Sequence, residues 1–308
     1  MNPAAKISAF VAALTASFGA AYGIGAAVGT DAGTTGSPER AEHAGSAAPH
    51  TDESREERPA GGLQITEGGY TLDLRTPRLE AGQRSELRFA VRDRAGDRVT
   101  EFRREHGKEL HLILASRDLA TYRHLHPTRA ADGTWSTPVE LPAAGDYRVF
   151  ADFTPAGANT GDLTLGADLA VSGPYRAAKL PKPARTALVD GYTVSLNGSL
   201  RPDVPERLTF TVRKGGRPVT DLQPYLGAYG HLVALRAGDL AHLHVHPEGS
   251  TKPGPGVSFT ATAPGSATYR LFLDFKHDGT VRTAAFTVPS GAAAQTPGTT
   301  APSDEHGH

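Results

Sequence analysis

The sequence is organised around a segment that occurs twice: His111-Leu-Ile-Leu-Ala-Ser-Arg-Asp-Leu-Ala-Thr-Tyr-Arg-His-Leu-His-Pro127 and His231-Leu-Val-Ala-Leu-Arg-Ala-Gly-Asp-Leu-Ala-His-Leu-His-Val-His-Pro247. In each copy a histidine is followed, after twelve intervening residues, by His-x-His-Pro. Apolar residues recur at every second position around these histidines, which is typical of half-buried antiparallel strands. Each copy is therefore predicted to form a β-hairpin.

The spacing of the histidines predicts which side of each hairpin they occupy. A two-residue turn at 117–118 in the first copy would place His111 directly opposite His124, and a turn at 237–238 would do the same for the second copy. Residues that face each other across two strands, or that lie two apart along one strand, project to the same side of a sheet. All three imidazoles of each copy are expected on one face, with apolar residues on the other.

The sequence around the two segments repeats as well. Tyr147-Arg-Val-Phe-Ala-Asp-Phe153 matches Tyr269-Arg-Leu-Phe-Leu-Asp-Phe275, and shorter matches precede the histidines in both halves. Short alternating segments separated by Gly, Pro and Asp give seven or so strands in roughly 110 residues, the pattern of an antiparallel β-sandwich. We predict an all-β protein of two tandem antiparallel β-sandwiches that follow an N-terminal hydrophobic helix.

The composition excludes several classes of function. The chain has 308 residues, a formal net charge of -1, 13 histidines, one methionine and no cysteine. Near-neutral charge gives no reason to expect a nucleic acid partner. The lack of cysteine excludes disulfides, thiolate metal sites and cysteine nucleophiles.

Changes in composition divide the chain into six parts. The uncharged run that ends at Thr30 is long enough to cross a bilayer and also fits a secretory signal, so we expect a signal anchor or a signal peptide, with the rest of the chain outside the cytoplasm. Polar, Pro- and Gly-rich segments predict disordered stretches and a stiff linker. The expected parts are 1–30 signal anchor or signal peptide, 31–62 disordered linker, 63–173 first sandwich, 174–186 linker, 187–289 second sandwich and 290–308 disordered tail.

Convergent imidazoles are the main candidates for chemistry. Neutral histidine nitrogens suit Cu(II), Zn(II) or Ni(II), whereas a single methionine and no cysteine make Cu(I) a poorer fit. The alternative is an ordinary solvent face, or a histidine face buried in a contact between domains. The expected metal ligands are His111, His124 and His126 in the first repeat and His231, His244 and His246 in the second, with His242 as an auxiliary ligand.

The sequence also suggests a role or a position for four further residues. Asp152 and Asp274 occupy matching places in the repeated strand, where each could ligate a metal, fix a histidine tautomer, or pair with the arginine four residues earlier. His106 and His277 have no counterpart in the other repeat and are expected at the surface.

The segment Asp221-Leu-Gln-Pro-Tyr-Leu-Gly-Ala-Tyr-Gly-His231, followed by His244-Val-His246-Pro, resembles a motif of bacterial secreted or membrane-anchored proteins associated with heavy-metal handling and efflux. The resemblance covers about 70 residues of each repeat and is better in the second, because the first repeat has a charged segment before His111. It implies Ig-like or cupredoxin-like domains and a metal context, without a defined reaction.

These observations lead to one main functional hypothesis and two alternatives. The main hypothesis is an extracytoplasmic protein that binds Cu(II) or Zn(II) for sequestration or delivery, with an envelope protein or a metal exporter as partner. The first alternative is an Ig-like interaction module of the cell envelope that holds no metal. A metal-dependent hydrolase or oxidase is a third possibility, but no catalytic motif is present, and we expect no enzyme.

Overall fold

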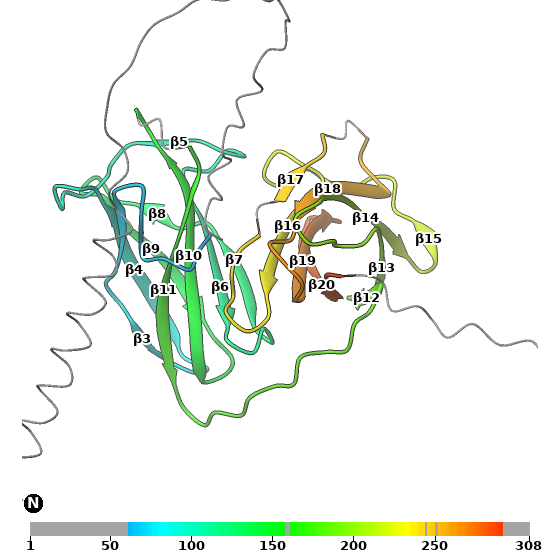
Figure 1. Cartoon of the computed structure of the whole chain (residues 1–308), viewed down its shortest axis with the longest axis horizontal. Helices are drawn as coiled ribbons and strands as arrows, with labels where there is room; N and C mark the ends of the chain where they lie inside the picture. The colour runs from blue at the N-terminus through cyan, green and yellow to red at the C-terminus, as the bar shows by residue number, and fades with distance from the viewer. Residues whose placement is uncertain (1–60, 158–160, 244, 250–251, 292–308) are drawn as a thin grey trace, which may run out of the picture. The chain divides into compact units, whose positions relative to one another are not determined.

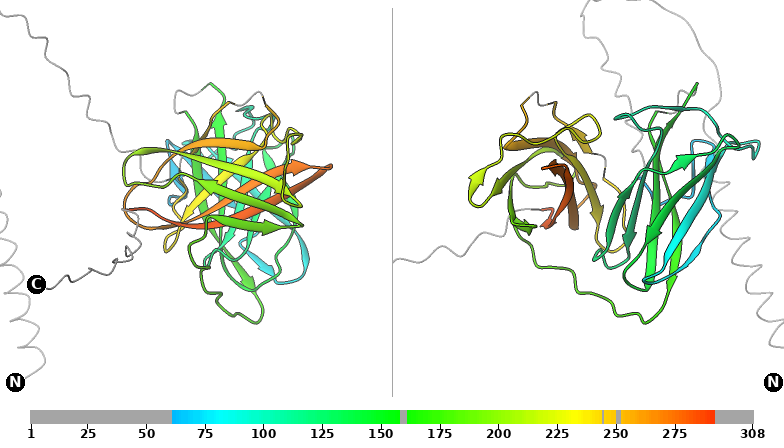
Figure 2. Two further views of the ribbon diagram at one scale, coloured as in Figure 1. Left: turned by 90° about the vertical axis from the view of Figure 1, so that its right-hand side faces the viewer. Right: turned by 180° about the vertical axis from the view of Figure 1, so that it is seen from behind.

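The structure is a computed structural model that describes residues 61–157, 161–243, 245–249 and 252–291. Every regular element in these residues is a β-strand (Figures 1 and 2). Within these ranges no helix is long and apolar enough to cross a membrane. The expected helix at 1–30 lies outside the described residues, as do His244 and nearly all of the expected disordered linker and tail.

The first repeat forms a β-sandwich of two sheets. Its strands are β1 (Thr66–Glu67), β2 (Tyr70–Leu74), β3 (Arg78–Glu80), β4 (Arg84–Arg92), β5 (Phe102–Arg103), β6 (His111–Ser116), β7 (Tyr122–Leu125), β8 (Thr128–Arg129), β9 (Thr134–Glu140), β10 (Gly145–Pro155) and β11 (Leu163–Ser172). One sheet has the order β1-β2-β4-β9-β8, and the other has the order β3-β11-β10-β6-β7, with β5 paired to β10. The pairs described are antiparallel, apart from β3 with β11.

The second repeat has the same two-sheet plan, with fewer strands in its second sheet. Its strands are β12 (Thr186–Val189), β13 (Tyr192–Asn197), β14 (Pro205–Lys214), β15 (Arg217–Pro218), β16 (His231–Arg236), β17 (Val245–Pro247), β18 (Gly256–Thr262), β19 (Thr268–His277) and β20 (Thr280–Pro289). The sheets have the orders β12-β13-β14-β18-β17, with β15 paired to β14, and β16-β19-β20. The tandem arrangement of two β-sandwiches is thus confirmed.

Most of the predicted strands are present. The matching Tyr-Arg-x-Phe-x-Asp-Phe segments lie in β10 and β19, which take equivalent places in their sheets. A tyrosine near the start of each of these strands donates a hydrogen bond to a backbone carbonyl four residues earlier, from Tyr147 to Ala143 at 2.9 Å and from Tyr269 to Gly265 at 3.2 Å. The alternating segment Val99-Thr100 and its match Val219-Thr220 are not in strands.

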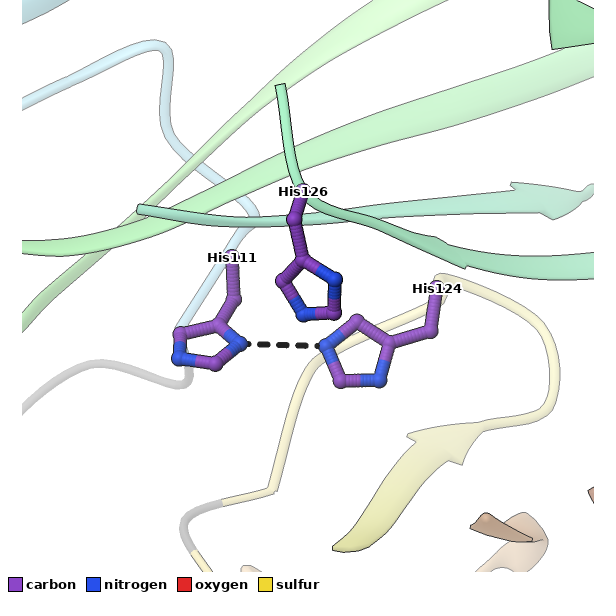
Figure 3. Close-up of side chains that lie close together, drawn as sticks. All are labelled: His111, His124 and His126. Carbon is purple, nitrogen blue, oxygen red and sulfur yellow. Dashed lines mark hydrogen bonds between the residues drawn. The ribbon is translucent and has the colours of Figure 1, made fainter. Parts of the chain in front are cut away.

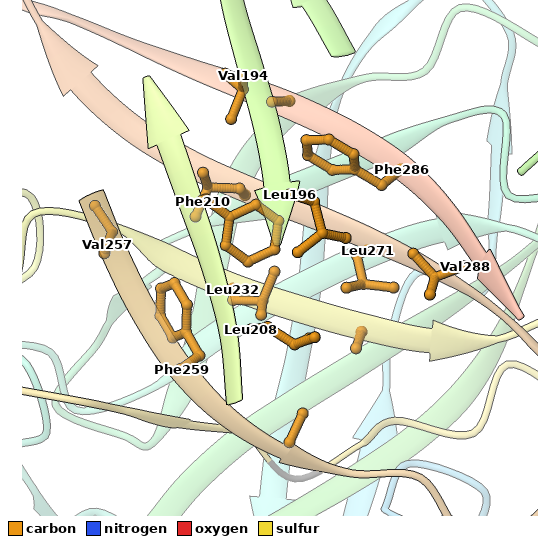
Figure 4. Packing of buried hydrophobic residues seen from close by; sticks show 14 of the residues in the cluster. Val194, Leu196, Leu208, Phe210, Leu232, Val257, Phe259, Leu271, Phe286 and Val288 are labelled. Carbon is orange, nitrogen blue, oxygen red and sulfur yellow. The ribbon is translucent and has the colours of Figure 1, made fainter. Parts of the chain in front are cut away.

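Each sandwich has its own apolar core, because one face of each sheet carries alternating apolar residues. Figure 4 shows the core of the second repeat, where Phe210, Phe259 and Phe286 pack between the sheets. A third apolar cluster joins the two repeats. Fully burying one large apolar side chain stabilises the folded state by about 1.5–3 kcal/mol. Its buried members are Ile113, Ala115, Leu119, Tyr122, Phe150, Val233, Leu235, Leu240 and Phe272.

The hairpin of the first copy has a longer loop than the sequence predicts. The N–H of Ser116 donates to the carbonyl of Thr121 at 2.9 Å, so the loop has four residues, 117–120, instead of two. The Asp118 carboxylate stabilises this loop by accepting from the Ser116 hydroxyl at 2.6 Å and from the Ala120 N–H at 3.1 Å. The expected turn at 117–118 is therefore wrong.

This longer loop moves the register by two residues. Leu112 pairs with Leu125, which places His111 opposite His126 and not opposite His124. A shift of one residue would have sent every side chain to the other face, but a shift of two keeps each side chain on its face. The predicted sharing of one face by the three histidines therefore survives an incorrect register.

The second copy begins in the same way and then departs. The N–H of Arg236 donates to the carbonyl of Ala241 at 2.9 Å, so the loop is again four residues long, 237–240, instead of the predicted turn at 237–238. After Leu243 the chain leaves β16, and β17 pairs with β18 of the other sheet, with His246 opposite Thr260. The second copy is therefore not a complete hairpin.

Candidate metal centre

Three histidines of the first repeat converge at the interface between the repeats. His111 begins β6, His124 lies in β7, and His126 follows β7 directly. Their rings point toward one another (Figure 3), and one nitrogen from each lies within 4.8 Å of the other two. The structure thus brings together the full histidine set predicted for the first repeat.

Hydrogen bonds on the far side of two of these rings fix which nitrogens are free. His111 Nε2 lies 3.3 Å from the carbonyl oxygen of Glu105, and His124 Nδ1 lies 2.9 Å from a carboxylate oxygen of Asp274. Both oxygens accept hydrogen bonds, so each of these two nitrogens carries a hydrogen and donates it. The inner nitrogens, His111 Nδ1 and His124 Nε2, are therefore left to face each other or a shared ligand.

These two nitrogens face each other at 3.2 Å, the hydrogen bond drawn in Figure 3, and the tautomers of the rings decide which of them donates. Two lone pairs at this distance repel unless a proton or another cation lies between them. Nitrogens bonded to one zinc ion at about 2.0–2.1 Å each would be separated by a similar distance. The arrangement therefore fits a shared cation.

Burial favours the neutral form of two of the three imidazoles. Burial, followed by the nearby His124 ring, lowers the pKa of His111 to about 4 and that of His126 to about 3. Both imidazoles are therefore neutral at physiological pH and retain a lone pair, as metal ligands require.

Asp274 connects the site to the second repeat. Its side chain is 3% exposed and accepts hydrogen bonds from His124, from the hydroxyl of Tyr122 at 3.3 Å and from the hydroxyl of Thr283 at 2.5 Å. A carboxylate that accepts from the outer N–H of a histidine is the usual means of orienting a metal ligand. Of the roles considered for Asp274, fixing a histidine tautomer is the one that the geometry matches.

His231 of the second repeat also lies in this cluster. Its ring centroid is 5.4 Å from that of His111 and 5.4 Å from that of His124, and the planes of His231 and His111 are inclined by 27°. Burial, followed by His124, lowers the pKa of His231 to about 2. The buried Nε2 atoms of His126 and His231 have no hydrogen-bond partner in the part of the chain that the structure describes.

The two repeats meet through equivalent faces. His111 and His231 hold the same place in β6 and β16, and their rings lie side by side. The joining cluster contains Phe150 and its counterpart Phe272, which contacts Tyr122 in a stacked arrangement with centroids 4.1 Å apart. The histidine face of the first copy is thus buried, together with His231, in a contact between the repeats.

A cavity of about 420 Å³ adjoins the cluster. Residues of both repeats line it, including the carboxyl groups of Glu105 and Asp152. Burial raises the pKa of Asp152 to about 6, and its carboxylate accepts from Thr164 at 3.0 Å. Arg148, considered above as a partner for Asp152, pairs with Asp168 instead.

The remaining histidines predicted for the second repeat do not form a matching group. His246 is exposed on β17, and the half-buried His242 has its ring centroid 6.1 Å from that of Phe150. Both line the cavity, but among the described residues only the set from the first repeat meets the geometry for a metal ion. His244 lies outside the described residues, so a separate second site stays a prediction.

His106 and His277 were both expected at the surface, and only His106 lies there. His106 is exposed, as expected, although its ring centroid lies 5.0 Å from that of His231. His277 is buried at 7% exposure, which contradicts the expectation. Its burial is possible because both ring nitrogens are hydrogen-bonded, to the Tyr192 hydroxyl at 2.7 Å and to Asp221 at 3.1 Å.

Some groups near the three histidines could not be predicted from the spacing of the histidines in the sequence. The Glu105 carbonyl that orients His111 is a backbone group, and Tyr225 lies with its ring centroid 6.4 Å from that of His124 and 6.1 Å from that of His126. The only signal in the sequence was that Tyr225 precedes the repeated segment in the second copy.

Comparisons with solved structures give remote likenesses. A DUF4426 family protein from Pseudomonas aeruginosa is 10% identical, with a TM-score of 0.28, over 34% of this chain and 96% of that one. The adhesin FdeC from Escherichia coli is 14% identical, with a TM-score of 0.25, over 73% of this chain and 65% of that one. InvD from Yersinia pseudotuberculosis is 13% identical, with a TM-score of 0.25, over 76% and 62%.

A comparison with curated proteins finds no match. The sequence does match a family described as "Domain of unknown function (DUF8832)", at residues 64–165 and again at 187–292. The two matched segments correspond to the two sandwiches and cover more than half of the 308 residues. The chain therefore belongs to the DUF8832 family and carries two copies of its domain.

Proposed function

We propose that this protein binds a divalent transition metal ion through His111, His124 and His126. The observation that carries the proposal is the convergence of the three rings: one nitrogen of each lies within 4.8 Å of the other two, and the outer nitrogens of His111 and His124 are both held by oxygen acceptors. This is the arrangement that prepares imidazoles for a shared metal ion. His126 supplies the third nitrogen.

The donor set favours Cu(II) or Zn(II). Three neutral imidazoles suit both ions, and no cysteine is available to supply a soft ligand. A three-histidine centre keeps a further position for water or for a transferred ligand. The proposed role is sequestration or delivery of this ion.

We further propose that both repeats are Ig-like and that they work outside the cytoplasm. The sheets β2-β4-β9-β8 and β11-β10-β6 follow the ABED and GFC strand orders of Ig domains. The bonds from Tyr147 and Tyr269 match the tyrosine corner of that fold. The apolar run at 7–30 supports export, with the membrane as anchor if the run is retained and an envelope protein or metal exporter as partner.

Titration of the purified full chain with Cu(II) and with Zn(II) at neutral pH tests metal binding. The wild type is expected to bind tightly, and a His124→Ala/His126→Ala variant is expected to lose that binding. His246→Ala is the matched control, because it removes an exposed imidazole of the same sequence motif and should retain the binding. Equal affinity in the wild type and in a folded double variant would refute the proposal, with circular dichroism as the check on folding.

A second candidate function is an interaction module without metal. The observation in its favour is that the histidine face is packed against the other repeat through a shared apolar cluster. In that case the imidazoles serve only the contact between the repeats. The same titration decides, because this candidate requires that neither ion binds stoichiometrically to the wild type.

A further inference from the structure

We infer that His231 of the second repeat is a fourth ligand of the same ion, so that the metal bridges the two sandwiches. The inference rests on the proposed metal site and changes its character. The sequence assigns one three-histidine site to each repeat, whereas this arrangement makes one four-nitrogen site from both.

Two ring contacts and one unpartnered nitrogen carry the inference. The ring of His231 forms a triangle with two members of the site, with centroid distances of 5.4 Å to His111 and to His124, which are themselves 5.4 Å apart. Its Nε2 is buried and has no hydrogen-bond partner among the described residues, although a buried polar atom normally has one. The free nitrogen of a ring in this position is suited to the open place of a three-histidine centre.

The second repeat already contributes to this site in another way. Asp274, which orients His124, is the direct cross-strand partner of His231 on β16 and β19. Residues paired across two strands project to the same face. One face of the second repeat therefore presents both a carboxylate for the outer side of a ligand and an imidazole for the ion itself.

The His231 ring must move slightly for this role. It is not among the three residues whose ligand atoms all lie within 4.8 Å of one another. The cavity lined by His111, His124 and His231 adjoins these rings. Completing the four ligands then requires that the two repeats stay docked, so metal binding and docking must favour each other.

X-ray absorption spectroscopy of the zinc-loaded full chain tests the inference by counting the coordinated imidazoles. We expect one zinc per chain with four imidazoles in the wild type and three in His231→Gln, which preserves much of the side-chain volume. Loss of an outer-shell partner typically lowers metal affinity roughly 10–100-fold, and loss of a ligand should lower it at least as much. His106→Gln is the matched control, because His106 is a neighbouring but exposed imidazole, and it should keep four.

The outcomes separate this inference from the proposed function. If wild type and His231→Gln bind one zinc with the same imidazole count and affinity, His231 is not a ligand and the three-histidine site stands alone. If the wild type binds no zinc and no copper, the proposed function fails and this inference fails with it. If two ions bind per chain, each repeat has its own site and the bridge is refuted.

Discussion

The two copies of the histidine segment have the same spacing and different structures. In the first copy, His124 and His126 stay beside β6, and the chain changes sheet only after Pro127. In the second copy the change comes earlier, and His246 pairs with the opposite sheet. Equal spacing therefore gathers histidines only while both strands of the hairpin remain paired.

The same comparison shows what the second copy does in place of forming its own group. It keeps His231 on the face that meets the first repeat and adds Asp274 behind His124. The duplicated units have thus become unequal: one supplies three converging imidazoles and the other supplies supporting groups. The predictions below test this inequality.

The largest effect on stability is expected in the apolar cluster that joins the two repeats, to which both repeats contribute a matching phenylalanine. Phe150→Ala and Phe272→Ala should each lower the free energy of unfolding by about 3–5 kcal/mol, because each removes a buried ring. Trp135, the one tryptophan, lies in the first repeat, so its fluorescence during denaturant unfolding reports on that repeat.

The informative variant is Phe272→Ala, which lies in the second repeat. It should shift the Trp135 transition of the first repeat to lower denaturant. Leu188→Ala, at a side chain that is 80% exposed, should change stability by no more than about 0.5 kcal/mol. An unshifted Trp135 transition in Phe272→Ala would show that the shared cluster does not stabilise the first repeat.

The next effect distinguishes the two matching aspartates. Asp274→Asn should weaken metal binding roughly 10–100-fold, because the charge that holds the His124 tautomer is lost. Asp152→Asn should change the affinity much less, since the hydrogen bond described for Asp152 is to Thr164. Competition titration against a chelator measures both. Equal losses in the two variants would mean that the repeats contribute symmetrically.

The pH dependence of the metal-free protein tests whether the imidazoles are buried and neutral. The folded-state pKa values of His111, His126 and His231 are about 4, 3 and 2, against about 6.5 in the unfolded chain. At a pH between the folded-state pKa of each histidine and its unfolded value, the unfolded chain binds more protons than the folded chain. The free energy of unfolding should therefore be highest above pH 6.5 and fall as the pH is lowered toward 3.

Asp152 acts in the opposite direction, because its pKa is raised to about 6 and its protonation favours the folded state below that pH. Three histidines outweigh one carboxyl group, so a net loss is expected. Denaturant unfolding at several pH values in the presence of a chelator measures it. His111→Gln should flatten the curve, and stability that does not change between pH 7 and 4 would contradict the burial of these rings.

The smallest effect is expected at His246, the exposed counterpart of His126. His246→Ala should change the free energy of unfolding by no more than about 0.5 kcal/mol. Thermal unfolding of the metal-free chain is a sufficient measurement. A large loss would assign His246 a structural role that its exposed place on β17 does not suggest.

The sequence predicts the fold and the first histidine set well, because both depend on the alternation of side chains along strands. His111, His124 and His126 share a face whichever even register the hairpin adopts. The actual loop length was not predictable from the two-residue turn pattern, since it depends on hydrogen bonds made by the side chains of Ser116 and Asp118.

Contacts between the repeats could not be predicted from local sequence patterns. Asp274 lies 150 positions from His124, and its place in the repeated strand suggested a role beside a histidine without indicating which one. The early change of sheet after Leu243 was hidden for the same reason, because the second copy retains the His-x-His-Pro motif that marks the hairpin in the first. Spacing predicts faces within a sheet, whereas docking determines what each face contacts.

The four-residue loop at 117–120 restricts how this protein can change without losing its cluster of imidazoles. Inserting or deleting one residue there would invert the facing of β7, sending His124 and His126 toward the core and Leu125 toward the second repeat. Removing or adding a pair of residues would leave the facing intact. Length variation among natural or engineered forms of this loop should therefore occur in steps of two wherever the histidines are retained.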